Sequence, residues 1–191
     1  MKPFKTTFLI FLIIIGISCS RKTEPKPYGY FRIDLPQNAY RPFTPAGYPY
    51  SFDISTYTVD SVITKSDEEY WININYPTLK GTIYCSYKPI NSNFRKIIED
   101  CRKFAYKHTV KADDIIERPY ENPDRKVYGI MYEISGNVAS PVQFFVTDSL
   151  HHLLRGALYF DATPNKDSIA PVVHFVYRDI VHLIETVQWK K

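Results

Sequence analysis

One short segment, residues 148–155, holds every residue type of a hydrolytic triad. Asp148, Ser149, His151, His152 and Arg155 lie around the turn of one expected hairpin. A serine becomes a nucleophile when a histidine takes its proton and a third group orients that histidine across the fold. Closeness in sequence does not supply this geometry, and an ordinary polar turn has the same composition. Two hypotheses therefore stand for this segment: an unrecognised hydrolase centred on Ser149 and His152, and a solvated turn.

Other catalytic and metal-binding signatures are missing. The sequence has no G-x-S-x-G elbow, no phosphate-binding loop, no dinucleotide fingerprint, no H-E-x-x-H and no C-x-x-C. Among five histidines, His174 and His182 lie two helical turns apart, too far to share an ion as an i, i+4 pair does, and Arg178 between them repels a cation. We expect no enzymatic activity, no metal and no cofactor.

Two cysteines, Cys85 and Cys101, follow Cys19 in the chain. Cys85 falls in an expected strand and Cys101 on the apolar face of an expected helix, at a similar depth by residue count. In an exported protein they meet an oxidising compartment. A disulfide requires Cα atoms within roughly 7 Å, which is tight between a helix and a sheet. Both a Cys85–Cys101 disulfide and two buried thiols stay open.

A basic cluster lies at and beyond the end of the first expected helix. It comprises Lys103, Lys107, His108 and Lys111. The cluster is suited to an anionic glycan, a lipid headgroup or an acidic partner. Cations also stabilise a helix C-terminus by offsetting its partial negative charge. An interaction patch and simple helix capping are therefore alternative interpretations.

The segment 28–57 carries six tyrosines among several prolines. The prolines exclude a regular helix, so we expect an extended arm over the core. Tyr28 and Tyr30 at its start complete the candidate interaction patch, because exposed aromatic side chains concentrate binding energy at interfaces. The same tyrosines can equally serve as packing that holds the arm down, which is the interpretation we favour.

Hydrophobic periodicity predicts the elements that must position these residues. Alternation of β-branched and aromatic residues predicts strands over 50–54, 57–63, 70–76, 81–88, 126–134, 143–147 and 153–160. Apolar residues spaced by three and four predict helices over 92–107 and 170–189. The order predicts an α+β fold: a twisted antiparallel sheet of about six or seven strands with two helices packed on it. By analogy of order, this layout is similar to that of Mog1 and PsbP proteins.

Helix boundaries follow from local capping signals. Asn91 or Ser92 is the expected cap of the first helix. Asp167 or Ser168, ahead of Pro171, is the expected start of the second.

The first nineteen residues are typical of an export signal that ends in a lipid-attachment site. Two lysines precede an apolar run of ten residues, 8–17, and small residues lead to Cys19. As a helix this run reaches about 15 Å, half of a bilayer core, so it is too short to span a membrane. A cysteine at this place resembles the acylated residue of a bacterial lipobox. We therefore expect lipidation of Cys19.

The domain organisation follows from this anchor. We expect a signal peptide over 1–18, a lipidated tether over 19–27 and a single globular domain over 28–191. Removing 1–18 lowers the formal net charge from +4 to +2, because Lys2 and Lys5 are lost. So small a charge argues against nucleic acid as a partner.

Several stretches together resemble the gliding motility-associated lipoprotein family GldD. They are 28–36 (YGYFRIDLP), 76–90 (YPTLKGTIYCSYKPI), 107–114 (KHTVKADD), 127–160 (VYGIMYEISGNVASPVQFFVTDSLHHLLRGALYF) and 179–190 (DIVHLIETVQWK). The resemblance implies a palmitate-type lipid anchor on Cys19, an envelope lipoprotein of the Bacteroidota, and a role in gliding and type IX secretion without an assigned enzymatic activity. It also places Ser61, Ser149 and Ser168 in Asp-Ser-aliphatic triplets that look like O-glycosylation sites of these bacteria, although Asp-Ser is ordinary turn chemistry.

The function expected from these observations is a lipid-anchored, non-catalytic accessory or assembly protein. Its expected partners are the membrane, through the anchor, and other envelope proteins of the gliding and type IX secretion machinery. A module that binds peptidoglycan or another periplasmic glycan is the alternative, and the hydrolase is the second. Ser20 after the cysteine, with no acidic run, resembles outer-membrane signals. We expect the periplasmic face of the outer membrane, with the inner membrane second.

Overall fold

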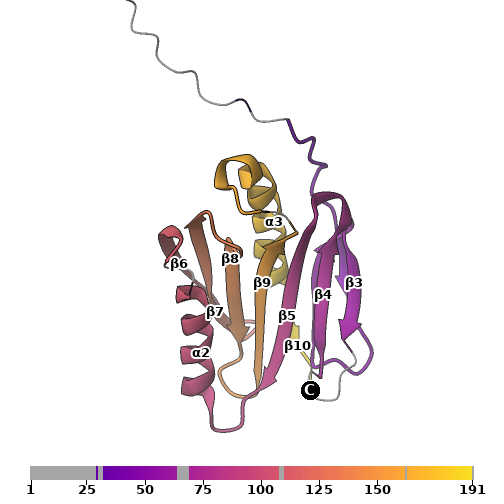
Figure 1. Cartoon of the computed structure of the whole chain (residues 1–191). Coiled ribbons are helices and arrows are strands. Elements are labelled where there is room, and N and C mark those ends of the chain that lie inside the picture. Colours follow the sequence, from indigo (N-terminus) through magenta and orange to yellow (C-terminus); the bar gives the residue numbers. More distant parts are fainter. Residues whose placement is uncertain (1–28, 30–31, 64–68, 108–109, 162, 191) are drawn as a thin grey trace, which may run out of the picture. The chain divides into compact units, whose positions relative to one another are not determined.

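The computed structural model describes residues 29, 32–63, 69–107, 110–161 and 163–190. The chain divides into two units, Met1–Tyr30 and Phe31–Lys191, and the elements described below belong to the second (Figure 1). None of the helices in the described ranges has the length and apolarity needed to cross a bilayer.

Seven strands form one antiparallel sheet. They are β3 (Val59–Ile63), β4 (Trp71–Tyr76), β5 (Gly81–Pro89), β6 (Ala112–Asn122), β7 (Val127–Gly136), β8 (Val142–Thr147) and β9 (His152–Phe160). The spatial order is β3-β4-β5-β9-β8-β7-β6, which places β5 and β9 side by side at the centre. This arrangement confirms the predicted α+β fold with an antiparallel sheet.

Strand β6 is absent from the sequence prediction, and its composition explains why. Its eleven residues alternate poorly and expose charged side chains and Pro119, with a register irregularity between Ala112 and Asp114. β6 pairs on one side only, with β7. Charges, proline and bulges are the features that protect a sheet edge from further pairing. The strand therefore forms because β7 offers a long partner, and its own periodicity contributes little.

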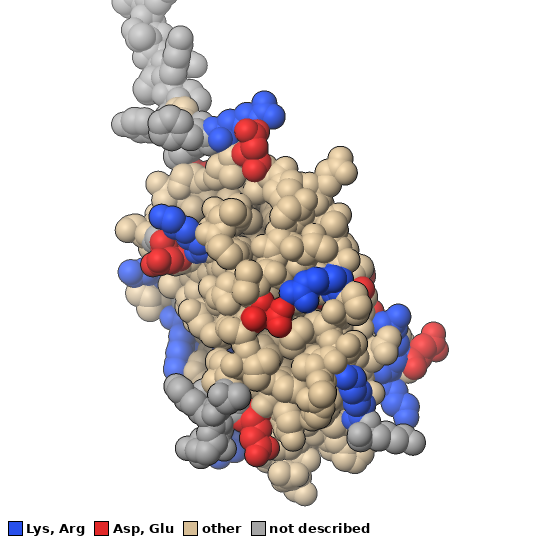
Figure 2. Space-filling view, turned by 90° about the vertical axis from the view of Figure 1, so that its right-hand side faces the viewer, with Lys and Arg blue, Asp and Glu red and all other residues tan. Residues whose placement is uncertain are grey.

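The other edge of the sheet, strand β3, is uncharged by comparison. Tyr57, Val59 and Val62 are exposed there, and Asp60 is ion-paired with Arg41. Figure 2 views this side of the molecule and shows Lys, Arg, Asp and Glu groups that are scattered among uncharged residues. The described residues of this side therefore present no concentrated charge for electrostatic recognition.

Three further strands form a second, smaller sheet. They are β1 (Tyr40–Phe43), β2 (Tyr50–Ser55) and β10 (Gln188–Trp189), in the order β1-β2-β10. Part of the expected extended arm is thus strand structure. The sequence prediction missed β1 and β10, both of which are short.

Two main helices lie on opposite faces of the large sheet. They are α2 (Phe94–Tyr106) and α3 (Lys166–Thr186), and a short 3-10 turn, η1 (Pro77–Leu79), precedes β5. Asn93 stands at the N-cap of α2, in place of the expected Asn91 or Ser92, and makes no side-chain capping bond. The N-cap of α3 is Asn165, in place of the expected Asp167 or Ser168, and its side chain accepts a hydrogen bond from the Ser168 backbone N–H. The helix therefore begins four residues before the predicted range of 170–189.

The predicted C-terminus of the second helix was wrong. α3 ends at Thr186, and the next residues pair with β2 as strand β10. Val187 has an extended backbone, with φ −54° and ψ 133°. The Thr186 hydroxyl accepts a hydrogen bond from the Asp53 N–H, and the Lys190 N–H donates to Pro49. Pairing with β2 therefore outweighs the helical spacing of the last apolar residues.

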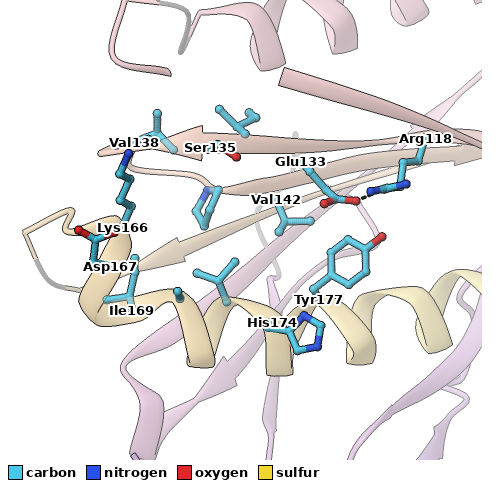
Figure 3. A pocket seen from close by; sticks show the side chains of 15 residues that line it. Arg118, Glu133, Ser135, Val138, Val142, Lys166, Asp167, Ile169, His174 and Tyr177 are labelled. Carbon is cyan, nitrogen blue, oxygen red and sulfur yellow. Dashed lines mark hydrogen bonds and ion pairs between the residues drawn. The ribbon is translucent and has the colours of Figure 1, made fainter. Parts of the chain in front are cut away.

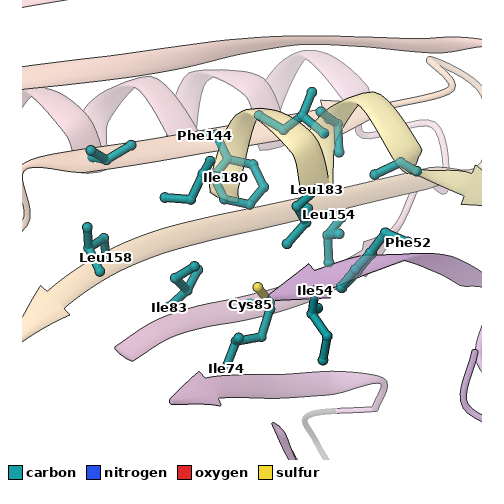
Figure 4. Packing of buried hydrophobic residues seen from close by; sticks show 14 of the residues in the cluster. Phe52, Ile54, Ile74, Ile83, Cys85, Phe144, Leu154, Leu158, Ile180 and Leu183 are labelled. Atoms are coloured by element: carbon teal, nitrogen blue, oxygen red, sulfur yellow. The ribbon is translucent and has the colours of Figure 1, made fainter. Parts of the chain in front are cut away.

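The main core lies between the large sheet, α3 and the small sheet. Figure 4 shows Ile180 and Leu183 of α3 beside Phe144 and Leu154 of the large sheet. Phe144 faces Gly156 across the β8–β9 pair, and a Cβ built on Gly156 would lie 2.2 Å from the phenyl ring. Glycine is therefore required at position 156 to admit that ring. A second core cluster lies on the other face, under α2, so β8 is buried along its whole length.

The two cysteines belong to different clusters, so the disulfide hypothesis was wrong. Cys85 faces the main core with α3, whereas Cys101 of α2 faces the second cluster. Both are free, buried thiols. Burial raises the pKa of Cys85 to about 12 and that of Cys101 to about 11. The residue count gave similar depths along the elements but did not show that the sheet separates the two side chains.

Candidate functional site

The hairpin of residues 148–155 does not assemble a hydrolytic triad. Asp148 Oδ1 accepts hydrogen bonds from three backbone N–H groups, those of residues 150 to 152, at 2.8 to 3.0 Å. The Ser149 N–H donates to Thr147 Oγ1, and no hydrogen bond among the described residues joins Ser149 Oγ to His151 or His152. The carboxylate therefore shapes the turn, and neither histidine of the hairpin is hydrogen-bonded to the serine hydroxyl.

His152 is part of the packing at the start of β9. Its Nδ1 lies 2.7 Å from the Tyr87 hydroxyl, and its ring stacks on Trp189 of β10 with centroids 5.3 Å apart. Burial lowers the pKa of His152, and the nearby Asp148 charge opposes that effect. His152 therefore connects the large sheet to the small one.

The environment of His152 predicts that the stability of the fold depends on pH. Burial lowers the pKa of His152 below its ordinary 6.5, so only the unfolded chain takes up this proton readily as the pH falls through that value. The free energy of unfolding should therefore be smaller at pH 5 than at pH 7.5, with a slope below about 1.4 kcal/mol per pH unit, the limit for one proton. Urea unfolding at a series of pH values measures it.

His152→Gln is the control, because glutamine can keep a hydrogen bond to Tyr87 but does not titrate. Its slope between pH 7.5 and 5 should be flatter than that of the wild type. Equal slopes in the two proteins would contradict the assignment.

Below about pH 4 a second loss of unfolding free energy is expected, both in the wild type and in His152→Gln. The backbone N–H groups that bind Asp148 outweigh its burial, which by itself raises the pKa, and hold the pKa of that carboxyl below its ordinary 3.8.

The two histidines of α3 do not form a metal site. His174 is exposed. His182 stacks on Tyr40 at 3.6 Å between ring centroids, and its Nε2 lies 3.2 Å from Asp53 Oδ2. Within the described ranges, no group of three or more His, Cys, Asp or Glu side chains is placed to hold a metal ion.

The predicted basic cluster is divided by its surroundings. Lys103 pairs with Glu99 at 2.9 Å, and Lys107 Nζ lies 4.7 Å from the centre of the Phe104 ring. Lys111 is exposed in the turn before β6. His108, like Tyr28, Tyr30 and Cys19, lies outside the described residues. Lys107 is thus the member of the cluster that adjoins an aromatic surface.

The described tyrosines of the arm mostly serve as packing. Tyr50 is fully buried and its hydroxyl donates to the Tyr70 carbonyl. Tyr48 packs edge-on against both of those rings. Tyr57 is the exception, with 44% of its surface exposed.

The three candidate glycosylation serines occupy different environments. Ser61 and Ser149 are exposed, on β3 and at the β8–β9 turn respectively. Ser168 is half-buried in the first turn of α3, and its hydroxyl donates to the Asn165 carbonyl. Modification at these positions stays a prediction.

A pocket of about 510 Å³ lies between the first turns of α3 and strands β6 to β8 (Figure 3). Its apolar lining includes Val138, Val142, Ile169 and Val173. Ala170, which is exposed, lies at its helical wall. A volume in this range is typical of sites that take a small molecule or an anchoring side chain.

Polar groups frame this pocket at both ends. Arg118 of β6 pairs with Glu133 of β7, which is its diagonal neighbour across the strand pair. The Tyr177 hydroxyl is hydrogen-bonded to Glu133, and the pKa of Tyr177 is raised by burial and by this carboxylate. At the other end Lys166 pairs with Asp113. The pocket thus has an apolar floor and a rim that carries both signs of charge.

Sequence reasoning did not single out this pocket. Arg118 and Glu133 lie on opposite arms of one hairpin, and Tyr177 is more than forty residues further along the chain. No local spacing in the sequence connects these three residues.

Comparison with known proteins gives one family. The family model described as gliding motility lipoprotein GldD matches residues 20–189. No curated protein matches the chain. Among solved structures, the solution structure of cyanobacterial PsbP (CyanoP) from Synechocystis sp. PCC 6803 superposes with a TM-score of 0.49 at 6% sequence identity, covering 83% of this chain and 97% of that one.

Proposed function

The chain belongs to the gliding motility lipoprotein GldD family, and from this membership we propose that it is a lipid-anchored, non-catalytic accessory protein of the gliding and type IX secretion machinery. The family match over 20–189 carries the proposal. A lipoprotein of this family is membrane-anchored in the cell envelope. Cys19 directly precedes the matched region and is the proposed acylated residue. The periplasmic face of the outer membrane is the proposed location, supported by Ser20 and the lack of an acidic run after Cys19.

A non-catalytic role is supported by the geometry of the strongest catalytic candidate. The Asp148 carboxylate is occupied by backbone N–H groups, and His152 is bound to Tyr87 and stacked on Trp189. Neither side chain is placed to activate Ser149. An accessory protein acts instead through a binding surface.

The pocket beside α3 is the proposed docking point for a partner protein of the machinery. The binding energy of a protein interface comes mainly from side chains that fill well-packed pockets. Charged groups at the rim select the partner. The apolar floor around Val142 and Val173 fits an aliphatic or aromatic anchor. The Arg118–Glu133 and Lys166–Asp113 pairs offer both signs of charge to its flanking residues.

Substitution of Ala170 by arginine tests this proposal. Ala170 is exposed on the helical wall of the pocket, so a long side chain there fills the space without entering the core, and arginine is a good helix former. After crosslinking in living cells, the wild-type protein purified from detergent-solubilised envelope should carry components of the gliding or secretion machinery. The amount of these components recovered with Ala170→Arg should be lower by roughly tenfold or more, as expected when a hot spot is blocked.

Glu185→Arg is the matched control, since Glu185 is an exposed residue near the other end of the same helix. It should recover the same partners as the wild type. Purification of the wild-type protein alone would contradict the proposed function. Full recovery by Ala170→Arg would reject only the pocket as the docking point.

A further inference from the structure

Half of one face of the large sheet is not covered by a helix. α2 covers this face over β6, β7, β8 and part of β9, and in Figure 1 β5, β4 and β3 stand clear beside it. The strand register places Asn73 of β4 beside Tyr84 of β5 on the open part. Tyr84 is 48% exposed and packs edge-on against Tyr159 at 5.7 Å between centroids. The open half is thus a surface of neutral polar and aromatic side chains.

A groove of about 610 Å³ runs along the boundary between α2 and this open half. Trp71, Ser86 and Asn91 contribute an aromatic ring and neutral hydrogen-bonding groups to its lining. The charged groups of the lining are Lys88, Lys96, Arg155 and Asp100. With three cations and one carboxylate, the groove has an excess of positive charge.

Arg155 is the centre of this charge. It is half-buried on β9, and its guanidinium donates one hydrogen bond, at 2.8 Å, to Gln143 Oε1. Among the described residues no carboxylate forms an ion pair with Arg155, Lys88 or Lys96. A guanidinium offers five N–H donors, and buried charges in proteins are ordinarily paired. Arg155 is therefore poised to bind an anion from outside the chain.

Aromatic rings lie directly beside these cations. The Arg155 guanidinium carbon and Lys107 Nζ lie 4.6 and 4.7 Å from the centre of the Phe104 ring, which is 43% exposed. Lys88 Nζ lies 5.3 Å from the centre of the Trp71 ring. Two like charges beside one ring repel each other, so an anion bound near them would be stabilising.

The position on a sheet face indicates the class of ligand. Within a sheet the backbone N–H and C=O groups are bonded in the plane, so a face offers side chains only, whereas an extended peptide is recognised at an edge. A ligand on the face must bring its own dense array of donors and acceptors and a surface that packs on aromatic rings. Sugar rings have both properties, and a carboxylate on the sugar matches Arg155.

We propose that this groove binds an acidic oligosaccharide, with the sugar rings against Trp71 and Phe104 and a carboxylate on Arg155. The site lies on the α2 side of the sheet, whereas the pocket proposed to dock a partner protein lies on the α3 side. The inference therefore goes beyond the proposed function and does not depend on it.

Titration of the full-length chain in neutral detergent micelles, followed by calorimetry, tests the proposal. The probe is a set of peptidoglycan glycan strands freed of their peptide stems, which keep the muramic acid carboxylates. A chitin oligomer of equal length lacks these carboxylates, and polyglutamate carries them on a polypeptide. The acidic glycan should bind at least tenfold more tightly than the other two, and binding should weaken as salt is added.

Arg155→Gln should weaken binding of the acidic glycan by roughly tenfold, the equivalent of one charge-assisted hydrogen bond. If Arg155→Gln lowers stability, Lys88→Gln serves as the second variant. It changes an exposed residue, and it should also weaken binding of the acidic glycan. Arg178→Gln, at an exposed position of α3, should bind as the wild type does. The proposal is overturned by an absence of binding, by equal or tighter binding of polyglutamate or the chitin oligomer, or by an equal loss in Arg178→Gln.

Discussion

Replacing Asp179 with alanine is expected to lower the free energy of unfolding by about 3 kcal/mol, because the buried Tyr76 hydroxyl and the half-buried Asn38 amide lose a charged acceptor. Asp179 is a carboxylate of α3 with only 3% of its surface exposed. Its Oδ2 accepts from the Tyr76 hydroxyl at 2.9 Å, and its Oδ1 accepts from Asn38 Nδ2 at 2.6 Å. Burial and this carboxylate together raise the pKa of Tyr76 far above its usual range. Urea unfolding at pH 7.5 measures the change.

Two further variants identify the cause of this loss. Tyr76→Phe removes one donor and leaves the carboxylate bound to Asn38, so it should lose only about 1 kcal/mol. The Asp179→Ala and Tyr76→Phe effects should be clearly non-additive when combined, since both act on one hydrogen bond. Glu185→Ala, at an exposed position of the same helix, should stay within about 0.5 kcal/mol of the wild type. A similarly small effect of Asp179→Ala would show that the buried network contributes little.

This network also fixes the position of the segment that precedes β1. Asn38 belongs to the extended segment that precedes β1, and Tyr40 at the start of β1 stacks on His182 of α3. Both contacts fasten the segment to the same helix. Asp179→Ala should therefore loosen residues 32–40 before the rest of the domain unfolds.

The sheet was predictable where side-chain alternation is strong. β2, β4, β5, β7, β8 and β9 all lie within two residues of the predicted strands at each end. These strands pack an apolar face against a core, so burial leaves a pattern of period two in the sequence. β6 carries no such pattern, because its edge position exposes most of its residues and favours charge.

The two proposed binding sites were not predictable, because each combines elements distant in sequence. The groove on the α2 side joins Trp71, Lys88, Phe104 and Arg155, which come from β4, β5, α2 and β9. The sequence indicates Arg155 only as a member of the hairpin of residues 148–155, whereas the strand register turns it to the opposite face of the sheet from His152. The predicted basic cluster did indicate part of this region, since its member Lys107 lies beside the Phe104 ring. No local spacing indicates which aromatic residues the fold brings beside these cations.

Replacement of residues 1–19 by an export signal that is cleaved directly before Ser20 should abolish the protein's contribution to gliding. The domain would then reach the periplasm without its proposed lipid. A single acyl chain gives only marginal membrane binding, whereas the several chains of a lipoprotein anchor bind stably, so removal should shift the protein almost completely from the membrane to the soluble fraction. Cell fractionation with immunoblotting measures the shift, and colony spreading and single-cell tracking measure gliding.

Single substitutions test the anchor chemistry directly. Cys19→Ala should eliminate incorporation of labelled palmitate, because the alanine side chain has no thiol to form the thioether bond to a diacylglyceryl group. Cys101→Ala is the matched control, since Cys101 is a buried free thiol inside the folded domain and should leave the labelling unchanged. Labelled palmitate in Cys19→Ala would place the lipid elsewhere. Normal gliding by the released soluble domain would show that this protein acts without its tether, because its binding surfaces would then reach their partners by diffusion alone.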